Sequence, residues 1–211
     1  FEDFDRVTFY GAGMCGYAAA AFSVTAPGAS LLAVAPIATL DPGVAGWDRR
    51  HLSGRRLDFR SRYGYAPDMI DGTARAFVLH DPAVAQQAMH AALFRKPFVT
   101  QLRCRYIGAE PEPALAAMAI LEPLIEEAVT GKLDAGSFAR HWRRRRRNGP
   151  WLRNVLAQIG ASRRPLREAV FCRAVLGLAK AAPRFRRRLG ELSAELEAQG
   201  ITLPPARNPT D

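Results

Sequence analysis

The order of apolar and polar positions predicts strands and helices in alternation over residues 1–111. Short apolar runs rich in β-branched and aromatic residues are typical of buried strands, and strict alternation is typical of a half-exposed strand. The predicted strands are Val7–Tyr10, Leu31–Ala35, Ala74–Leu79 and, at a sheet edge, Phe98–Tyr106. Helices are predicted at Tyr17–Val24 and Ala83–Phe94. Strands that alternate with helices favour a parallel sheet covered by helices.

Residues 112–200 lack this alternation and show the helical period instead. Apolar residues three and four positions apart mark one face of each predicted helix. These helices are Pro113–Val129, one or two around Phe138–Ile159, Pro165–Ala182 and Arg184–Gln199. The proline-rich residues 201–211 are predicted to form a disordered tail. The expected organisation is a three-layer α/β domain with a mostly parallel sheet over 1–111, followed by a basic α-helical extension over 112–200.

A glycine-rich turn stands between the first predicted strand and the first predicted helix. Gly11, Gly13 and Gly16 have the spacing G-x-G-x-x-G, which lets the backbone approach a dinucleotide pyrophosphate at a helix N-terminus. That motif also needs an acid at the end of the second strand. The second strand is followed by Pro36, and the first acid after it is Asp41. Nucleotide binding by this turn is therefore an alternative prediction and not the leading one.

The same turn resembles the nucleophile elbow of a group of bacterial α/β-hydrolase-like proteins. Residues 10–19 are Y-G-A-G-M-C-G-Y-A-A, where that group has Y-G-x-S-M-G-G-Y-A-A. Residues 35–50, which contain Trp47-Asp48-Arg49-Arg50, and residues 77–82, with His90 on the helix behind them, are also similar to the group. The resemblance covers about residues 5–110, roughly half of the chain, and implies an α/β-hydrolase-like fold.

The elbow departs from this pattern at the position of the nucleophile. Gly13 stands where the resembling proteins have the nucleophilic serine, and the loop after Tyr106 holds no histidine. The resemblance places the triad acid at Asp81. Because acyl transfer needs a nucleophile, a base and an orienting acid together, we expect a degenerate, non-catalytic protein that acts by binding a ligand or partner. We also expect the N-terminal part of the domain, which would supply half of the oxyanion hole, to be missing.

An active enzyme is the second possibility. Cys15, in the first turn of the helix, would then be the nucleophile of a hydrolase or acyltransferase, with Asp81 and His90 as catalytic partners. Asp81 follows the third strand, and open α/β sheets bind ligands at the carboxyl ends of their strands. We expect a small-molecule or anionic ligand in that crevice. The turn residues expected to contact it are Gly11, Gly13, Met14 and Gly16.

Proteins similar to this chain often carry the label phosphoadenosine phosphosulfate reductase. Such an enzyme needs a nucleotide loop of the type S-G-G-x-D-S and a C-terminal cysteine in an E-C-G-x-H setting. Neither motif occurs in this sequence, and Cys172 lies in a predicted helix where it fits a core position. The residues therefore disfavour that activity, and no cofactor is expected.

The chain has a net charge of +10, and its basic residues are unevenly placed. Between Lys132 and Arg188 there are 17 lysine and arginine residues and two acids. One uninterrupted run with a tryptophan on either side consists of Arg143, Arg144, Arg145, Arg146 and Arg147. Such a surface suits a polyanionic partner. An arginine-favouring codon usage is the competing explanation, because only three of the 30 basic residues are lysines.

Cysteine use and hydropathy favour a cytoplasmic location. Cys15, Cys104 and Cys172 are an odd number, are widely spaced and match no metal-binding pattern, which fits a reducing compartment. No apolar run reaches the roughly 18 residues that a membrane-spanning helix needs. No metal site and no membrane span are therefore predicted.

Overall fold

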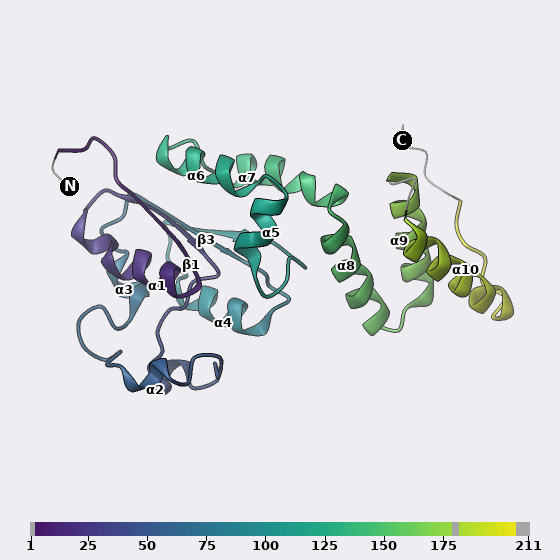
Figure 1. Ribbon diagram of the computed structural model, residues 1–211, viewed down its shortest axis with the longest axis horizontal. Helices are drawn as coiled ribbons and strands as arrows, with labels where there is room; N and C mark the ends of the chain where they lie inside the picture. The colour runs from purple at the N-terminus through teal and green to yellow at the C-terminus, as the bar shows by residue number, and fades with distance from the viewer. Residues whose placement is uncertain (1–2, 179–181, 206–211) are drawn as a thin grey trace. The chain divides into compact units, whose positions relative to one another are not determined.

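The computed structural model describes residues 3–178 and 182–205, and the chain divides into two compact units, residues 1–143 and 144–211 (Figure 1). The first unit contains a sheet with helices, and the second contains three helices. The elements of the first unit are β1 (Thr8–Ala12), α1 (Gly13–Phe22), η1 (Ser23–Thr25), β2 (Ser30–Val34), α2 (Pro42–Ala45), η2 (Gly54–Arg56), α3 (Ala66–Met69), β3 (Arg75–His80), α4 (Ala85–Leu93), β4 (Val99–Arg103), α5 (Pro111–Ala117), α6 (Leu121–Val129) and α7 (Ala135–Trp142). The 3-10 helix η3 (Arg143–Arg147) leads to α8 (Gly149–Ala161), α9 (Pro165–Leu178) and α10 (Pro183–Ala198).

The four strands lie in the order β1-β2-β3-β4, and every neighbouring pair is parallel. The expectation of a parallel α/β sheet is therefore confirmed, as is the position of the fourth strand at a sheet edge. Phe9, Leu31 and Ala76 lie opposite one another in register across the first three strands. This register aligns the carboxyl ends of β1 and β2, where the glycine turn begins.

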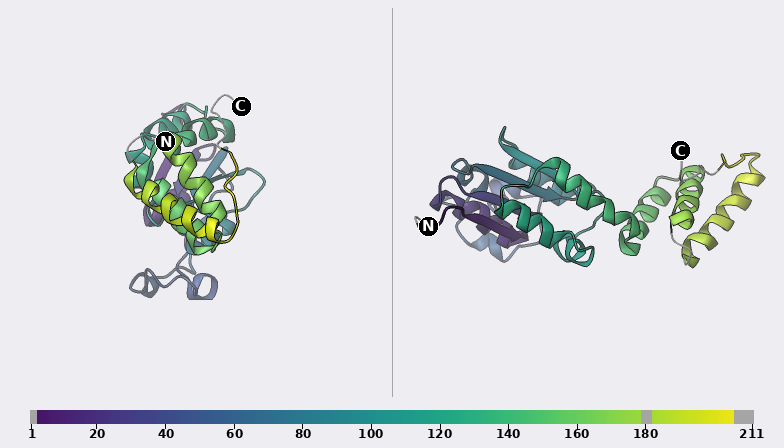
Figure 2. Two further views of the ribbon diagram at one scale, coloured as in Figure 1. Left: turned by 90° about the vertical axis from the view of Figure 1, so that its right-hand side faces the viewer. Right: turned by 90° about the horizontal axis from the view of Figure 1, so that it is seen from above.

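Helices cover both faces of the sheet, because both faces are apolar. Leu31 and Ala33 of β2 pack with helical alanines such as Ala20 on the face covered by α1, α3 and α4. Leu32 and Val34 alternate to the other face, where α6 packs against β1 and β2 and α7 against β4. Figures 1 and 2 show the strands between these two groups of helices. Central strands buried on both faces have the continuous apolar pattern of parallel sheets.

The compact units divide after Arg143, whereas the pattern of the sequence places the domain boundary at residue 111. The helices α5, α6 and α7 have the amphipathic pattern of an extension, but they form the second helical layer over the sheet. Without them, Leu32 and Phe77 would expose an apolar sheet face to water. The helical extension is therefore shorter than expected and begins with the arginine run.

One predicted helix is broken in the structure. Residues 113–129 form α5 and α6, with Ala119 between them at φ +53°. Pro123 explains the break, since a proline lacks the N–H that a helix interior needs and its ring clashes with the carbonyl four residues earlier. Residues 179–181 of the predicted helix Pro165–Ala182 lie outside the described residues, as do residues 206–211, most of the predicted disordered tail.

The second unit is built around a small core shared by α8, α9 and α10. Leu152 and Leu156 of α8, Cys172 and Val175 of α9, and Phe185 of α10 make up this core. The short connections between these helices are typical of antiparallel neighbours. In Figure 2, α9 and α10 lie along each other, and they form the most extensive contact between helices of this unit.

Candidate functional site

The glycine turn has no intervening loop. Strand β1 ends at Ala12, and Gly13 is the first residue of α1, with φ +55°. This left-handed conformation disfavours residues with a Cβ, so glycine is the natural residue here. The carbonyl of Gly13 accepts a hydrogen bond from the N–H of Ile37 at 3.3 Å. The turn is therefore a sharp strand-to-helix corner that is tied to the segment following β2.

Gly11 and Gly16 are required by close packing within the corner. A Cβ at Gly11 would lie 2.3 Å from the backbone oxygen of Cys15, and a Cβ at Gly16 would lie 3.2 Å from Cα of Pro36. A Cβ at Gly13 would meet no atom within 4 Å. Packing and backbone conformation thus account for the G-x-G-x-x-G spacing without a dinucleotide. Only position 13 has open space beside it.

A pocket of about 340 Å³ opens at the carboxyl ends of β1 and β2. Its walls come from the glycine corner, from the segments that follow β2 and α2, and from the start of α5. The lining residues are Ala12, Gly13, Val34, Ala35, Ile37, Arg50, His51, Ala109, Glu110, Pro111, Glu112 and Pro113. Ala35 adopts φ +44°, a conformation that is rare outside glycine and that is often found at functional sites.

Two larger hollows, of about 630 and 600 Å³, lie at the amino ends of the strands. Their walls include Arg75, at the start of β3, and Gly131. Open parallel sheets bind ligands at the carboxyl ends of their strands, because loops and helix N-termini converge there. The smaller pocket beside Gly13 is therefore the candidate site.

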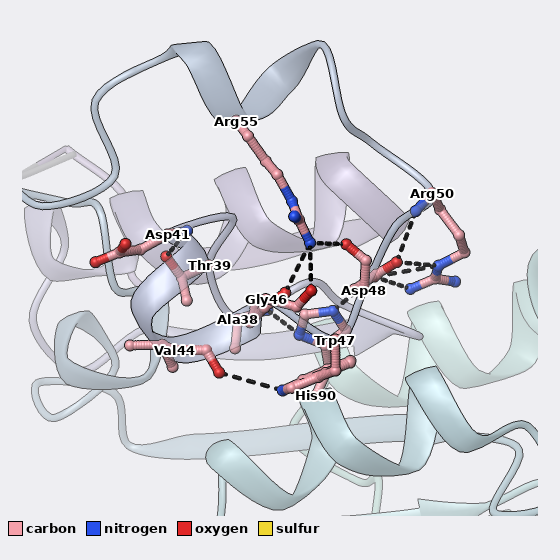
Figure 3. Close-up of polar contacts among 11 residues, drawn as sticks. Ala38, Thr39, Asp41, Val44, Gly46, Trp47, Asp48, Arg50, Arg55 and His90 are labelled. Carbon is pink, nitrogen blue, oxygen red and sulfur yellow. Dashed lines mark hydrogen bonds and ion pairs between the residues drawn. The ribbon is translucent and has the colours of Figure 1, made fainter.

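Arg50 is held at this pocket by a buried carboxylate. Asp48 has no exposed surface, and its Oδ2 lies 2.6 Å from Nη2 of Arg50. Asp48 Oδ1 accepts hydrogen bonds from the backbone N–H and from Nε of Arg50, at 3.0 and 2.9 Å. Figure 3 shows this fork-like arrangement. The Arg50 side chain is 40% exposed, so its guanidinium is fixed in orientation yet open to solvent.

His90 completes the support of Asp48 from the other side. Its Nδ1 accepts a hydrogen bond from the N–H of Ala38 at 3.2 Å, so the ring hydrogen is on Nε2, which donates to Asp48 Oδ2 at 2.9 Å (Figure 3). The ring of Trp47 packs on the imidazole with 4.5 Å between centroids. Both nitrogens of this buried ring are occupied, so His90 is a positioning residue here and has no free nitrogen to act as a base.

The pKa values agree with this neutral-imidazole arrangement. Burial lowers the pKa of His90, although the neighbouring Asp48 acts in the opposite direction. Burial opposes ionisation of Asp48, but hydrogen bonds from Arg50 and His90 outweigh it and hold the pKa of that carboxyl well below its usual range. Asp48 is therefore an anion at neutral pH, and Arg50 is its counter-ion.

Asp81 has a different role. It follows β3, is buried, and its Oδ1 accepts hydrogen bonds from the N–H groups of Ala83 and Tyr106 at 2.8 and 3.0 Å. Its Oδ2 accepts one from the N–H of Gly108 at 2.9 Å. The carboxylate thus joins the loops that follow β3 and β4. Within the described residues no hydrogen bond connects Asp81 to His90 or to Cys15, so the three predicted catalytic residues are not assembled into a triad.

The remaining predicted contacts are divided between the pocket and the surface. Cys15 and Met14 are exposed, Gly11 and Gly16 are buried in the corner, and Gly13 alone of this group lines the pocket. Asp48 and Arg50 were not predicted as site residues. Their segment was marked only by its resemblance to the hydrolase-like group, and nothing in the sequence pairs Asp48 with a histidine 42 positions away.

Arg143–Arg147 form η3, and the run is exposed except at Arg145. The guanidinium of Arg145 lies over the ring of Trp151, with 5.3 Å to the centroid. Among the described residues, no group of three or more His, Cys, Asp or Glu side chains is placed to hold a metal ion, and no helix is both long and apolar enough to cross a bilayer.

Comparison of the chain with protein-family models, with curated proteins and with solved structures finds no match. The function of this chain is therefore inferred from the pocket and its residues.

Proposed function

We propose that this protein is a non-catalytic binding protein of the α/β-hydrolase-like type, and that its strand-end pocket takes a small organic acid. The observation that carries the proposal is Arg50, a pocket-lining guanidinium fixed by the buried carboxylate of Asp48. Arginine held in this way recognises carboxylate or phosphate with little loss of side-chain entropy.

The strand–turn–helix corner supports the hydrolase-like part of the proposal. A nucleophile elbow places its serine on a strained turn at the top of the sheet, facing the substrate. Gly13 occupies that kind of turn, with φ +55° and open space where a side chain would project into the pocket. A glycine there removes the nucleophile and leaves its space available to a ligand.

The opposite wall of the pocket defines the rest of the ligand. Glu110 and Glu112 line it, and Glu112 accepts a hydrogen bond from the hydroxyl of Tyr10. Carboxylates repel an acidic group but accept hydrogen bonds from hydroxyl or ammonium groups. A volume of about 340 Å³ is at the small end of ligand pockets. The best-fitting class is therefore a small hydroxy or amino acid, with its carboxylate at Arg50.

Thermal denaturation of the full chain with paired probes tests this proposal. Lactate and serine should raise the midpoint in a concentration-dependent way, because a ligand that binds only the folded state stabilises it. Lactamide and serinamide, which lack the carboxylate, should not. Arg50→Gln should abolish the shift, while the exposed neighbouring variant Arg49→Gln should retain it. Equal shifts with acids and amides, or no shift with any probe, would contradict the proposal.

The absence of catalysis is tested separately with acylating and fluorophosphonate probes. We expect no stoichiometric, saturable labelling of the native chain, since among the described residues no hydrogen bond joins Cys15 or a serine hydroxyl to a histidine. Labelling of Cys15 that disappears in Cys15→Ala would instead support the hydrolase or acyltransferase alternative.

A further inference from the structure

We propose that the second unit binds the phosphodiester backbone of duplex nucleic acid through the amino ends of α8 and α10. Five exposed arginines form this surface, which we call the arginine end: Arg146, Arg147, Arg153, Arg184 and Arg187. The proposal is independent of the pocket in the first unit.

The fold brings the two amino ends together. Leu152, in the first turn of α8, and Phe185, in the first turn of α10, belong to one core cluster with Val175 near the end of α9. Arginines that precede or begin α8 are therefore at the same end of the unit as those that begin α10. Arginines more than 30 positions apart in the chain thus contribute to one basic surface.

The charge of this surface is not compensated locally. Residues 144–211 contain 15 basic and five acidic residues, and no acid occurs between Asp134 and Glu168 or between Glu168 and Glu191. Three of the five acids, Glu191, Glu195 and Glu197, lie in the second half of α10, away from the arginine end. The positive potential is therefore concentrated at one end of the unit instead of being spread over it.

The helix dipoles add to this potential. Neither α8 nor α10 has an acidic residue in its first turn, and α10 has Arg184 there. The amino end of a helix carries a partial positive charge, so arginine beside it is electrostatically unfavourable and a bound anion is favourable. Backbone N–H groups at helix amino ends are frequent phosphate contacts in nucleic-acid complexes. The N–H of Trp151 at the start of α8 is already bonded to the Asn148 side chain at 2.8 Å, so the guanidinium groups are the phosphate contacts and the two helix dipoles add to the attraction.

Other arginines of the unit have structural partners, and the arginine end does not depend on them. Arg188 pairs with the buried Glu168 at 2.6 Å, and Arg173 donates to the carbonyl of Pro205. Arg146, Arg147, Arg153 and Arg184 make no ion pair with another described residue, and Arg187 has only an exposed pair with Glu191 at 3.7 Å. These five side chains are thus available to phosphate.

The apolar surface distinguishes a nucleic acid from a membrane. A membrane-bound helix places several large apolar side chains beside its basic residues. Near the arginine end, Leu178 is the exposed large apolar residue of the described part of α9, while Leu166 and Val170 lie toward the other end of that helix. Trp151 is half-buried with Arg145 over its ring, so it offers no open platform for stacking unpaired bases. Backbone contact with a duplex is the mode that remains.

Fluorescence anisotropy of the full chain with random-sequence duplex DNA and duplex RNA tests the proposal. The logarithm of the association constant should fall linearly with the logarithm of salt concentration, with a slope of about −3 to −5 for three to five phosphate contacts. Equal affinity for the two duplexes indicates recognition of the shared phosphodiester backbone. A higher affinity for one of them shows whether DNA or RNA fits the surface better.

Two matched triple variants locate the site. Arg146→Gln/Arg147→Gln/Arg184→Gln should weaken binding by about tenfold or more at low salt and make the slope shallower by about three. Arg163→Gln/Arg164→Gln/Arg167→Gln removes the same charge from exposed positions at the other end of the unit and should weaken binding less than about threefold. Circular dichroism melts confirm that both variants are folded.

Three results would overturn the proposal. One is the absence of duplex binding at low salt, and another is an equal loss in the two triple variants, which would indicate general attraction by net charge. The third is binding to phosphatidylserine vesicles that exceeds binding to either duplex at the same ionic strength and depends on Leu178, since that would identify the surface as a membrane contact.

Discussion

The two units differ in how their basic residues are balanced by acidic ones. Residues 1–143 contain 15 basic and 15 acidic residues, and the cations there have partners such as Asp48 for Arg50 and Asp41 for Arg60. Residues 144–211 carry the whole net charge of the chain, with basic residues three times as numerous as acids. Codon usage alone would enrich arginine in both units, but it would not remove the acids from one of them. The imbalance is therefore a property of the second unit.

The comparison also separates two ways of presenting a guanidinium. In the first unit a single arginine is oriented by a buried anion and a neutral histidine, which suits one small ligand. In the second unit several arginines are exposed without such anchors, which suits a long polyanion that adapts to them. Substitutions at the buried anchor, the glycine corner, the buried histidines and the arginine end test this distinction.

Loss of the buried anchor should be the most damaging change in the first unit. Asp48→Asn leaves the guanidinium of Arg50 and the ring N–H of His90 facing an amide, and should lower the free energy of unfolding by about 3 kcal/mol. Urea denaturation followed by circular dichroism measures the change. Asp68→Asn, at an exposed position, is the control and should lie within about 0.5 kcal/mol of wild type. If Asp48→Asn lowered the free energy of unfolding by less than about 1 kcal/mol, the contacts of Asp48 with Arg50 and His90 would contribute little to stability.

Alanine substitution should cost more stability at Gly11 than at Gly13. Gly11→Ala forces a Cβ against the backbone of Cys15 and should cost about 2–3 kcal/mol of stability. Gly13→Ala meets no atom and should cost only about 1 kcal/mol, from its left-handed conformation. Denaturant midpoints of the two variants give the difference. If Gly13→Ala were the more damaging, the open space beside that residue would not exist in solution.

Acid should destabilise the first unit through its buried histidines. Burial lowers the pKa of His90 and of His80, so below about pH 6.5 the unfolded chain binds protons that these groups do not bind in the folded state. Stability is therefore complete above that pH and falls as the pH drops through it, by up to about 1.4 kcal/mol per pH unit for each histidine.

Urea midpoints between pH 7.5 and 5.5 test this pH dependence. His90→Gln, although less stable at every pH, should show a shallower fall than wild type, with the remaining slope owed to His80. An unchanged slope in His90→Gln would mean that His90 does not stay neutral in the folded state.

The smallest effect is expected from the arginine end itself. Arg146→Gln/Arg147→Gln/Arg184→Gln removes cations from the amino ends of α8 and α10 and should raise stability by about 0.5 kcal/mol. Arg163→Gln/Arg164→Gln/Arg167→Gln, which removes two cations after the carboxyl end of α8, should leave stability unchanged or slightly lower it. Thermal melts at low ionic strength resolve the difference. Stabilisation by both triple variants would point to general charge repulsion instead of the dipole arrangement.

The sequence predicted much of the fold and little of the site. The four strands and their parallel order follow from apolar runs and from the helices between them, which are local patterns. The boundary between units did not follow, because α5–α7 have the same amphipathic pattern whether they cover a sheet or one another. The break at Pro123 was readable in principle, since a proline inside a helical pattern is itself a signal.

Of the predicted site residues, Gly13 lines the pocket, whereas Asp81 and His90 are structural supports. An acid at a strand end is equally suited to catalysis and to bracing two loops, and residue type alone does not distinguish the two. Asp48 gave almost no signal, because its partners Arg50 and His90 are recognised only when the long segment after β2 is folded back onto α4.

Two features of this protein follow from local sequence alone. One is the strand–glycine–helix corner, which depends on the conformational freedom of a few adjacent residues. The other is the concentration of positive charge after Arg143, which is a property of composition along the chain. Which polar groups meet, in contrast, depends on how distant segments pack. Contacts such as Asp48 with His90, or the shared end of α8 and α10, depend on long-range packing of apolar faces, which brings side chains together without regard to their separation in sequence.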